Sequence, residues 1–175
     1  MKRICCVGSA AVLGLLLSAS ALAAPGAGDR LPPEYTVEHG LTQSEAVPAT
    51  KEEVARTART PAELAAIKGS TACWQHHWRF ERGHLAYYRA VNQQTFWCSD
   101  WRVITYRSTN TWPDTGALCG VMWGPDSWRS GGGVGSWYVD VTSLGGFSCW
   151  VNWFDYRDWI QFTIRFTYYG SSYPV

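Results

Sequence analysis

The stretch DWIQFTIRFTYY, residues 158–169, constrains the fold most, because its apolar and polar residues alternate one by one. Side chains alternate across a pleated strand, so this stretch predicts a β-strand with one buried face and one face in contact with solvent. A strand of this kind needs other segments to cover its apolar face. The apolar face consists of Ile160, Phe162, Ile164, Phe166 and Tyr168.

Short alternating segments of the same kind fill the chain from Cys73 onward, and residues typical of turns separate them. Turn chemistry is clear at Arg82-Gly83, at Gly124-Pro125-Asp126 and at Gly145-Gly146. Such a series predicts an all-β fold, an antiparallel β-sandwich of about seven strands. The expected strands are residues 73–81, 85–92, 101–108, 117–123, 135–142, 147–153 and 158–169.

The first 23 residues have the features of a signal peptide. Met1-Lys2-Arg3 is positively charged, residues 4–19 form an apolar run, and Ala21-Leu22-Ala23 has the small-x-small form of a cleavage site. A membrane span needs roughly 20 apolar residues, and glycine and serine residues weaken this run. We therefore expect residues 1–23 to be removed, the protein to be secreted and extracellular, and no stable membrane span to remain.

Residues 24–70 differ in composition from the rest, being rich in Ala, Pro, Thr and Glu with Tyr35 as their only aromatic residue. A segment with so little apolar surface does not offset the entropy of ordering it. We expect this Pro/Ala-rich segment to be a linker or a pro-segment, the latter acting as an arm that covers the following domain, residues 71–175.

Two local helix signals interrupt that segment. Thr50 with Glu53, and Thr60 with Glu63, have the spacing of a capping box, in which the two side chains satisfy the first backbone N–H groups of a helix. The extension before the sandwich is therefore expected to be partly helical. The predicted helices are residues 51–59 and 61–68.

Four cysteines remain after the expected cleavage: Cys73, Cys98, Cys119 and Cys149. An even number in an exported domain predicts two disulfides, although four cysteines permit three pairings. A turn at Arg82-Gly83 would fold the first hairpin back and bring Cys73 close to Cys98. We therefore predict Cys73 with Cys98 and Cys119 with Cys149. Structural zinc sites commonly use C-x-x-C pairs, which the sequence lacks, so no metal is expected.

The arrangement of cysteines and aromatic residues is similar to that of small Trp-rich secreted proteins encoded by actinobacteria. The resemblance covers residues 73 to about 170 and implies an exported protein with a β fold, but it carries no catalytic residue. The residues that carry it are Cys73-Trp74, Tyr87-Tyr88, Trp97-Cys98, Ile104-Thr105, Gly135-Ser136-Trp137, Phe147 and Cys149.

Histidines provide few candidates for catalysis. His76 and His77 occupy neighbouring positions of one predicted strand, so they point to opposite faces and cannot serve one site. His77 with His84 and Glu81 could meet across the hairpin as a metal or general-base site, whereas His76 is more simply a core residue. No Gly-x-Ser-x-Gly elbow is present. We predict no catalytic residue and no cofactor.

Carboxylates give the alternative of a small hydrolase, because glycoside hydrolysis needs only two of them close together. Asp155 and Asp158 flank one predicted turn, and Asp114 and Asp126 lie in two other predicted loops. Loop aspartates more commonly accept hydrogen bonds from their own backbone. A calcium site built from two of these loops is the remaining interpretation.

The aromatic content carries the functional hypothesis. All 11 Trp lie between Trp74 and Trp159, and a sandwich of this size cannot place every ring inside, since half of the strand positions point outward. Exposed rings suit sugar stacking and protein recognition, whereas the alternative is that they fill gaps and cover the sheets beneath Arg side chains. The predicted ligand-binding residues, in or beside loops, are Trp112, Trp123, Trp128 and Arg129.

A net charge of +1 gives no electrostatic argument for nucleic acid. We therefore predict a secreted, non-catalytic binding module whose partner is a cell-wall or environmental polysaccharide or a cell-surface protein. The alternatives are a secreted antibacterial effector with a pro-segment, and the carboxylate-dependent hydrolase. The sequence does not determine the oligomeric state.

Overall fold

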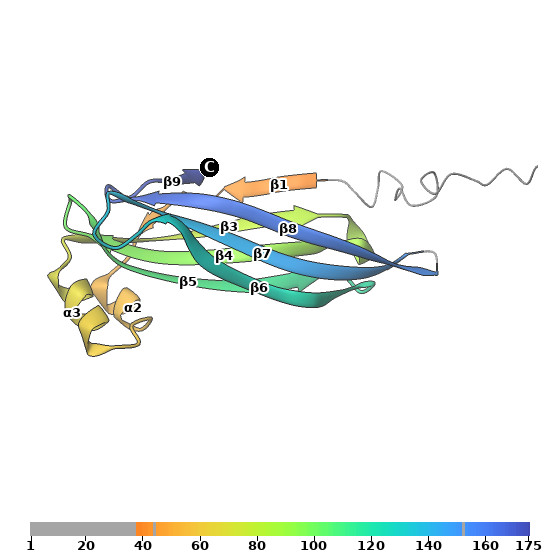
Figure 1. Cartoon of the computed structure of the whole chain (residues 1–175), viewed down its shortest axis with the longest axis horizontal. Coiled ribbons are helices and arrows are strands. Elements are labelled where there is room, and N and C mark those ends of the chain that lie inside the picture. Colours follow the sequence, from red (N-terminus) through yellow and green to blue (C-terminus); the bar gives the residue numbers. More distant parts are fainter. Residues whose placement is uncertain (1–37, 44, 152) are drawn as a thin grey trace, which may run out of the picture. The chain divides into compact units, whose positions relative to one another are not determined.

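Two antiparallel sheets face each other in the computed structural model of the chain (Figure 1), which describes residues 38–43, 45–151 and 153–175. The expected signal peptide and the first part of the Pro/Ala-rich segment lie outside these residues. The first sheet has the order β1-β3-β4-β5, with β2 also paired to β3, and the second has the order β6-β7-β8-β9. The predicted all-β sandwich is confirmed.

The strands of the first sheet are β1 (Glu38–Gln43), β2 (Val47–Pro48), β3 (Ala72–Arg82), β4 (Arg89–Ser99) and β5 (Ile104–Thr115). Those of the second sheet are β6 (Cys119–Gly132), β7 (Tyr138–Val151), β8 (Phe154–Thr167) and β9 (Ser172–Pro174).

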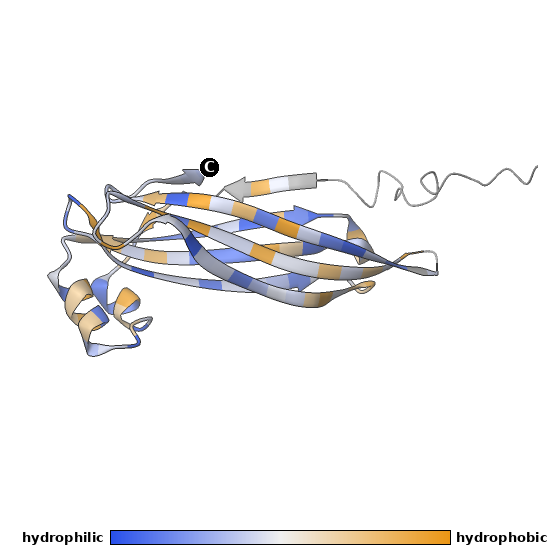
Figure 2. Cartoon of the chain, in the orientation of Figure 1, coloured by the Kyte–Doolittle hydropathy of each residue, from blue (hydrophilic) through white to orange (hydrophobic). Residues whose placement is uncertain are grey.

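The alternation that defines β8 also builds the core. Its residues Ile160, Phe162, Ile164 and Phe166 are buried, and across from them Trp78 and Trp97 of the first sheet are almost fully enclosed. Colouring by hydropathy shows the same alternation as bands along the strands (Figure 2). Six aromatic rings, three of them tryptophans, are part of this core cluster: Trp74, Trp78, Trp97, Phe147, Phe162 and Phe166.

The predicted break at Gly145-Gly146 is wrong, because β7 runs through both glycines as one strand. Their lack of a side chain serves packing: a Cβ on Gly145 would lie 2.7 Å from Val91, and one on Gly146 would lie 2.6 Å from the Trp159 ring. Glycine inside a strand marks such close approaches as well as turns. The expected strands 135–142 and 147–153 are therefore one.

The hairpin at Arg82-Gly83 forms as predicted, with Gly83 at φ +79° and no room for a Cβ beside the Tyr87 carbonyl. The strand expected at 85–92 begins later, since Leu85–Tyr87 is a 3-10 turn and β4 starts at Arg89. The long β4 pairs along its whole length with β3, and this register places Cys73 opposite Cys98.

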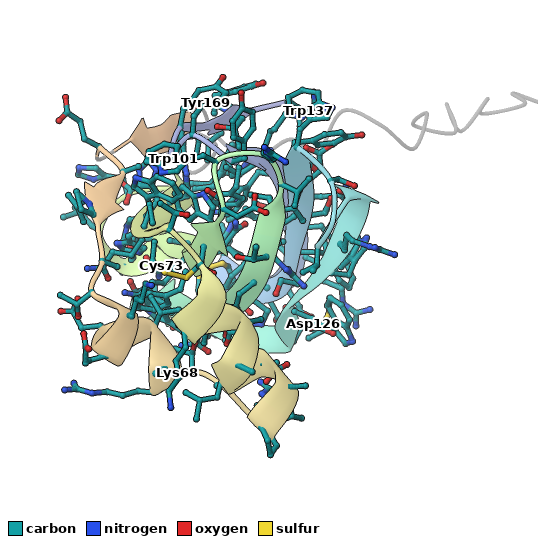
Figure 3. All side chains as sticks on the ribbon, turned by 90° about the vertical axis from the view of Figure 1, so that its left-hand side faces the viewer. Lys68, Cys73, Trp101, Asp126, Trp137 and Tyr169 are labelled. Atoms are coloured by element: carbon teal, nitrogen blue, oxygen red, sulfur yellow. A yellow bond between two sulfur atoms is a disulfide. The ribbon has the colours of Figure 1, made fainter. Side chains whose placement is uncertain are left out.

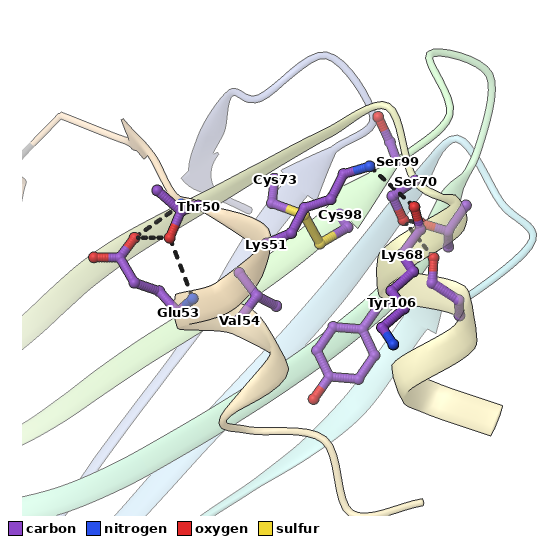
Figure 4. The surroundings of a disulfide bond; sticks show 12 residues. Thr50, Lys51, Glu53, Val54, Lys68, Ser70, Cys73, Cys98, Ser99 and Tyr106 are labelled. Atoms are coloured by element: carbon purple, nitrogen blue, oxygen red, sulfur yellow. Dashed lines mark hydrogen bonds between the residues drawn. A yellow bond between two sulfur atoms is a disulfide. The ribbon is translucent and has the colours of Figure 1, made fainter. Parts of the chain in front are cut away.

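Both capping boxes are present and start the two helices, α2 (Lys51–Ala55) and α3 (Pro61–Gly69). The helices pack on the outer face of the first sheet, where Val54 and Ile67 are fully buried against Cys73, Cys98 and Tyr106 (Figure 4). The Thr57 hydroxyl lies 2.8 Å from the Tyr106 hydroxyl. The helical segment therefore covers the sandwich at this end, and β1 and β2 add to its first sheet.

The two predicted disulfides are confirmed, Cys73–Cys98 across β3 and β4 and Cys119–Cys149 across β6 and β7. The first lies on the outer face of its sheet beneath the helices, and the second packs with Val151 and Tyr156 on the inward side of its sheet. Each bridge stabilises a domain of this size by roughly 2–4 kcal/mol. Two disulfides are consistent with an extracellular protein.

Candidate functional site: a tryptophan row on the second sheet

Four tryptophans lie on the outward side of the second sheet, two from β6 and one each from β7 and β8. Their side chains remain between 42% and 53% exposed, although each belongs to a strand rather than to a loop tip. We call this set the tryptophan row. It consists of Trp123, Trp128, Trp150 and Trp159.

The register of β7 with its neighbours places these rings on one face. Trp123 lies opposite Gly146 on one side, and Trp159 lies opposite the same Gly146 on the other. The Trp159 ring lies over the bare backbone of Gly146, and its centroid is 6.0 Å from that of Trp123 at an interplanar angle of 50°. Gly146 thus lets two indoles meet above the middle strand of the sheet.

The other two members extend the row in both directions along β7. Trp128 lies opposite Thr142, and Trp150 belongs to β7 itself. Thr142, Gly146 and Trp150 are separated by four residues each, which at about 3.3 Å per strand residue is a step of about 13 Å. The row therefore spans about 26 Å along the strands.

Polar groups flank the rings. Near Trp150, Asp155 accepts hydrogen bonds from Ser148 and Arg157. Farther along the same face, the Arg165 guanidinium donates to both oxygens of Asp140 at 2.7 and 2.8 Å. These bonds raise the pKa of Arg165 further above its usual range. The face combines flat apolar surfaces with fixed donors and acceptors.

The structure brings together only part of the predicted ligand-binding set. Trp123 and Trp128 share the row, but Trp112 lies on the outer face of the first sheet, stacked on His77 with a centroid distance of 5.1 Å. Arg129 lies opposite the core residue Val141 and therefore leaves β6 on the inward side. The residues that the prediction missed, Trp150 and Trp159, carry a readable signal, because both occupy outward positions in alternating segments.

Further aromatic residues gather at the loop end of the sandwich. Trp101, Trp137 and Tyr169 come from three different connections and lie along the upper edge of the view from that end (Figure 3). They are about half exposed. Trp137 lies beside Arg165 of the second sheet, with the guanidinium 5.7 Å from its ring centroid. Trp101, which packs against Trp74 of the first sheet, is therefore the control for the tryptophan row.

The two histidines of β3 point to opposite faces of the first sheet. His76 is buried, with its ring beside Trp78 and its Nδ1 hydrogen-bonded to the Ser172 hydroxyl. His77 faces the other way, as the alternation predicts, and its Nε2 lies 3.1 Å from the Asn92 amide oxygen. Among residues 38–43, 45–151 and 153–175, no group of three His, Cys, Asp or Glu side chains could hold a metal ion.

The carboxylates considered for a hydrolase are also separated. Asp155 and Asp158 both lie within β8, not at a turn, and the strand points them to opposite faces. Asp158 is buried and forms ion pairs with Arg89 at 2.5 Å and Arg82 at 3.1 Å. Asp114 forms an ion pair with Arg79 on the first sheet. Asp114 and Asp158 thus pair with arginines of other strands, whereas Asp155 pairs with Arg157 within β8.

No described helix is long and apolar enough to cross a bilayer. Comparisons with protein-family models, with curated proteins and with solved structures found no match for the chain.

Proposed function

We propose that the protein is an exported, non-catalytic module that binds a polysaccharide through the tryptophan row. The observation that carries this proposal is the line of half-exposed indoles on one sheet face, centred on the pair that meets above Gly146. Planar aromatic rings offer large, rigid contact surfaces at low entropic cost. A pyranose ring presents a comparable flat apolar face.

The length of the row favours a polymer over a single small molecule. Rings spread over about 26 Å can contact several sugar units of one extended chain at once, and linked contacts on one ligand add avidity. Fixed polar groups such as Asp155 and Arg157 at the Trp150 end can hydrogen-bond to hydroxyls beside the stacked rings. The net charge of +1 gives no electrostatic preference for a charged ligand, which is compatible with a neutral polymer.

Four exposed tryptophans are unusual on the outward face of a sheet if their only role is structural. Exposed apolar patches on a sheet invite association, and strand positions that face water are commonly polar. The same outward face of β8 does carry Gln161 and Thr163 next to Trp159. The residues around the tryptophans are thus polar, as expected for a face in contact with solvent, and the exposed indoles are the exception.

A pull-down on insoluble chitin, cellulose, xylan and peptidoglycan tests the proposal, with tryptophan fluorescence followed on the matching soluble oligosaccharides. We expect retention on at least one polymer, and we expect the double variant Trp123→Ala/Trp159→Ala to lose at least tenfold in affinity. Absence of retention on all four would overturn the polysaccharide proposal in favour of a protein partner.

The matched control is Trp112→Ala, which removes one indole from the outer face of the opposite sheet. It should bind as the unchanged protein does. Near-UV circular dichroism of every variant verifies that the fold survives. Equal loss in the control and in the row variant would contradict the assignment of the site to the second sheet.

A further inference from the structure

A polar groove runs along the open side of the sandwich, where β5 and β6 are the neighbouring edge strands of the two sheets. Its volume is about 460 Å³, within the range of small-ligand sites. The Thr111 hydroxyl donates to the Pro125 carbonyl at 3.2 Å and ties the two edges together at one point. Hydroxyl and amide side chains dominate its lining, among them Thr57, Ser108, Thr109, Asn110 and Ser127.

A chain of buried hydrogen bonds leads from the core to this groove. The Ser143 hydroxyl donates to the Gln93 amide oxygen at 2.7 Å, and the Gln93 amide donates to Thr95 at 3.3 Å. Thr95 lies 3.1 Å from Thr109, whose hydroxyl accepts from the Arg107 guanidinium at 3.2 Å. Buried polar groups are costly unless they are hydrogen-bonded. These side chains satisfy one another, and the series of hydrogen bonds holds the Arg107 side chain in place at the groove.

Arg129, on the opposite strand, does not itself line the groove, but it is close enough to Arg107 for their charges to interact. It leaves β6 on the same side as Ser127, which lines the groove. Burial lowers the pKa of Arg107, and the positive charge of Arg129 lowers it further. Within the described part of the chain, no carboxylate forms an ion pair with either guanidinium. Two like charges are thus held near each other without a neutralising side chain.

The two acids that line the groove are already engaged with backbone N–H groups. Glu63 accepts from Arg59 N at 2.6 Å and from Thr60 N at 3.1 Å, as the capping box requires. Asp126 accepts from Ser127 N at 2.7 Å. Arg107 donates from one nitrogen to Thr109, and Arg129 donates from one nitrogen to the Gly132 carbonyl, each at 3.2 Å. A guanidinium has five N–H donors, so each arginine keeps further donors for an anion.

We propose that this groove binds the anionic group of an acidic glycan, with Arg107 and Arg129 as the charge partners and the surrounding hydroxyls and amides as partners of the sugar. Guanidinium groups bind carboxylate, sulfate and phosphate oxygens through paired hydrogen bonds. Side chains that both donate and accept match a polyhydroxylated ligand. This site lies on the open side of the sandwich and does not depend on the tryptophan row.

Titration calorimetry of the whole oxidised protein tests the site with trigalacturonate, a sulfated heparin disaccharide and glucose 6-phosphate, and with maltotriose as the neutral probe. We expect at least one anionic probe to bind at least tenfold tighter than maltotriose, and the tightest probe identifies the anion as carboxylate, sulfate or phosphate. Failure of all three anionic probes to exceed maltotriose would overturn the proposal.

Variants distinguish the site from general charge attraction. Arg107→Gln and Arg129→Gln should each weaken the anionic probe about tenfold or more, whereas Arg102→Gln, which removes the same charge from an exposed residue between β4 and β5 that does not line the groove, should leave binding unchanged. Arg129 is exposed, so Arg129→Gln should fold normally. This variant still tests the site if Arg107→Gln fails to fold. Equal weakening by Arg102→Gln would contradict the site.

The double variant Trp123→Ala/Trp159→Ala should bind the anionic probe as the unchanged protein does, because neither ring lines the groove. Failure of the tryptophan row to bind polymers and failure of the groove to bind anions are thereby separate results. Loss of anion binding in this double variant would contradict an independent site.

Discussion

The two sheets differ in what covers their outer faces. On the first sheet, α2 and α3 lie over Cys73–Cys98, and the residues they insert, Val54 and Ile67, have no exposed surface. On the second sheet, the tryptophan row keeps about half of each ring in contact with solvent. One outer face is covered at one end by the chain's own helices. The row on the other face is left bare although its side chains are larger.

This difference bears on function because covering apolar surface stabilises a protein by roughly 25 cal/mol per Å². The chain uses a helical segment for that purpose at the disulfide and not at the row. Contiguous exposed apolar surface commonly marks an interaction site. The comparison therefore supports a ligand as the component that covers the second sheet.

The largest expected effect contrasts the two sides of β8. Asp158→Asn should lower the free energy of unfolding by about 3–5 kcal/mol, because the buried Arg89 guanidinium loses the carboxylate charge that faces it. Asp155→Asn, on the exposed side, should change it by less than about 0.5 kcal/mol. Urea denaturation measures both. Similar effects of the two substitutions would contradict the separate roles of the two faces.

The next prediction compares the surface beneath the helices with the exposed tryptophan row. Ile67→Ala should cost about 2–5 kcal/mol of stability, since it leaves a cavity between α3 and the first sheet. Trp159→Ala should cost less than half of that, because much of the ring is already exposed. Thermal unfolding compares the two, and a greater loss from Trp159→Ala would show that the row is mainly a packing feature.

Gly146→Ala sharpens the comparison within the second sheet. The added methyl would meet the Trp159 ring at 2.6 Å, so the ring must shift from Trp123, at a cost of about 1–3 kcal/mol. We expect polymer retention to fall with it. Gly120→Ala, at a position with open space around it, is the control and should retain full binding. The idea fails if Gly146→Ala alters neither tryptophan fluorescence nor retention.

The smallest expected effect is the loss of α2 stability at low pH. Hydrogen bonds from the Thr50 backbone N–H and then from its hydroxyl lower the pKa of Glu53. A lowered folded pKa means that the carboxylate stabilises α2 above the ordinary glutamate pKa of about 4.3. This contribution is lost as the pH falls through the lowered value. We expect the NMR signals of the Val54 methyl groups to shift with this protonation before those of the core of the second sheet do.

The matched control for the acid prediction is Thr50→Ala, which removes the hydroxyl of the capping box. The helix signals in this variant should respond at a higher pH, closer to the ordinary value. Identical titration in both proteins would contradict the role of Thr50.

Local rules were enough for much of the fold. The alternation at 158–169, the turn at Arg82-Gly83, both capping boxes and the two disulfides follow from sequence spacing alone, and the structure confirms them. Gly145-Gly146 was misjudged because a turn and a close approach require the same missing Cβ, and only the neighbouring strand shows which one applies.

The candidate site was only partly predictable for the same reason. Trp112 and Trp123 both lie near turn residues, but which sheet each one joins depends on the long-range order of the strands. The outward position of Trp159 was readable from its alternation with Ile160, whereas its contact with Trp123 depends on a register across β7. The similarity to Trp-rich actinobacterial proteins and the secreted location stay predictions.

Hydroxyl-radical footprinting tests the central claim most directly, with the protein free and then bound to whichever polymer retains it. We predict that oxidation of Trp123, Trp128, Trp150 and Trp159 falls in the bound state while that of Trp101 at the loop end is unchanged. Protection confined to the loop end, or retention without any protection of the four indoles, would contradict a binding surface on the second sheet.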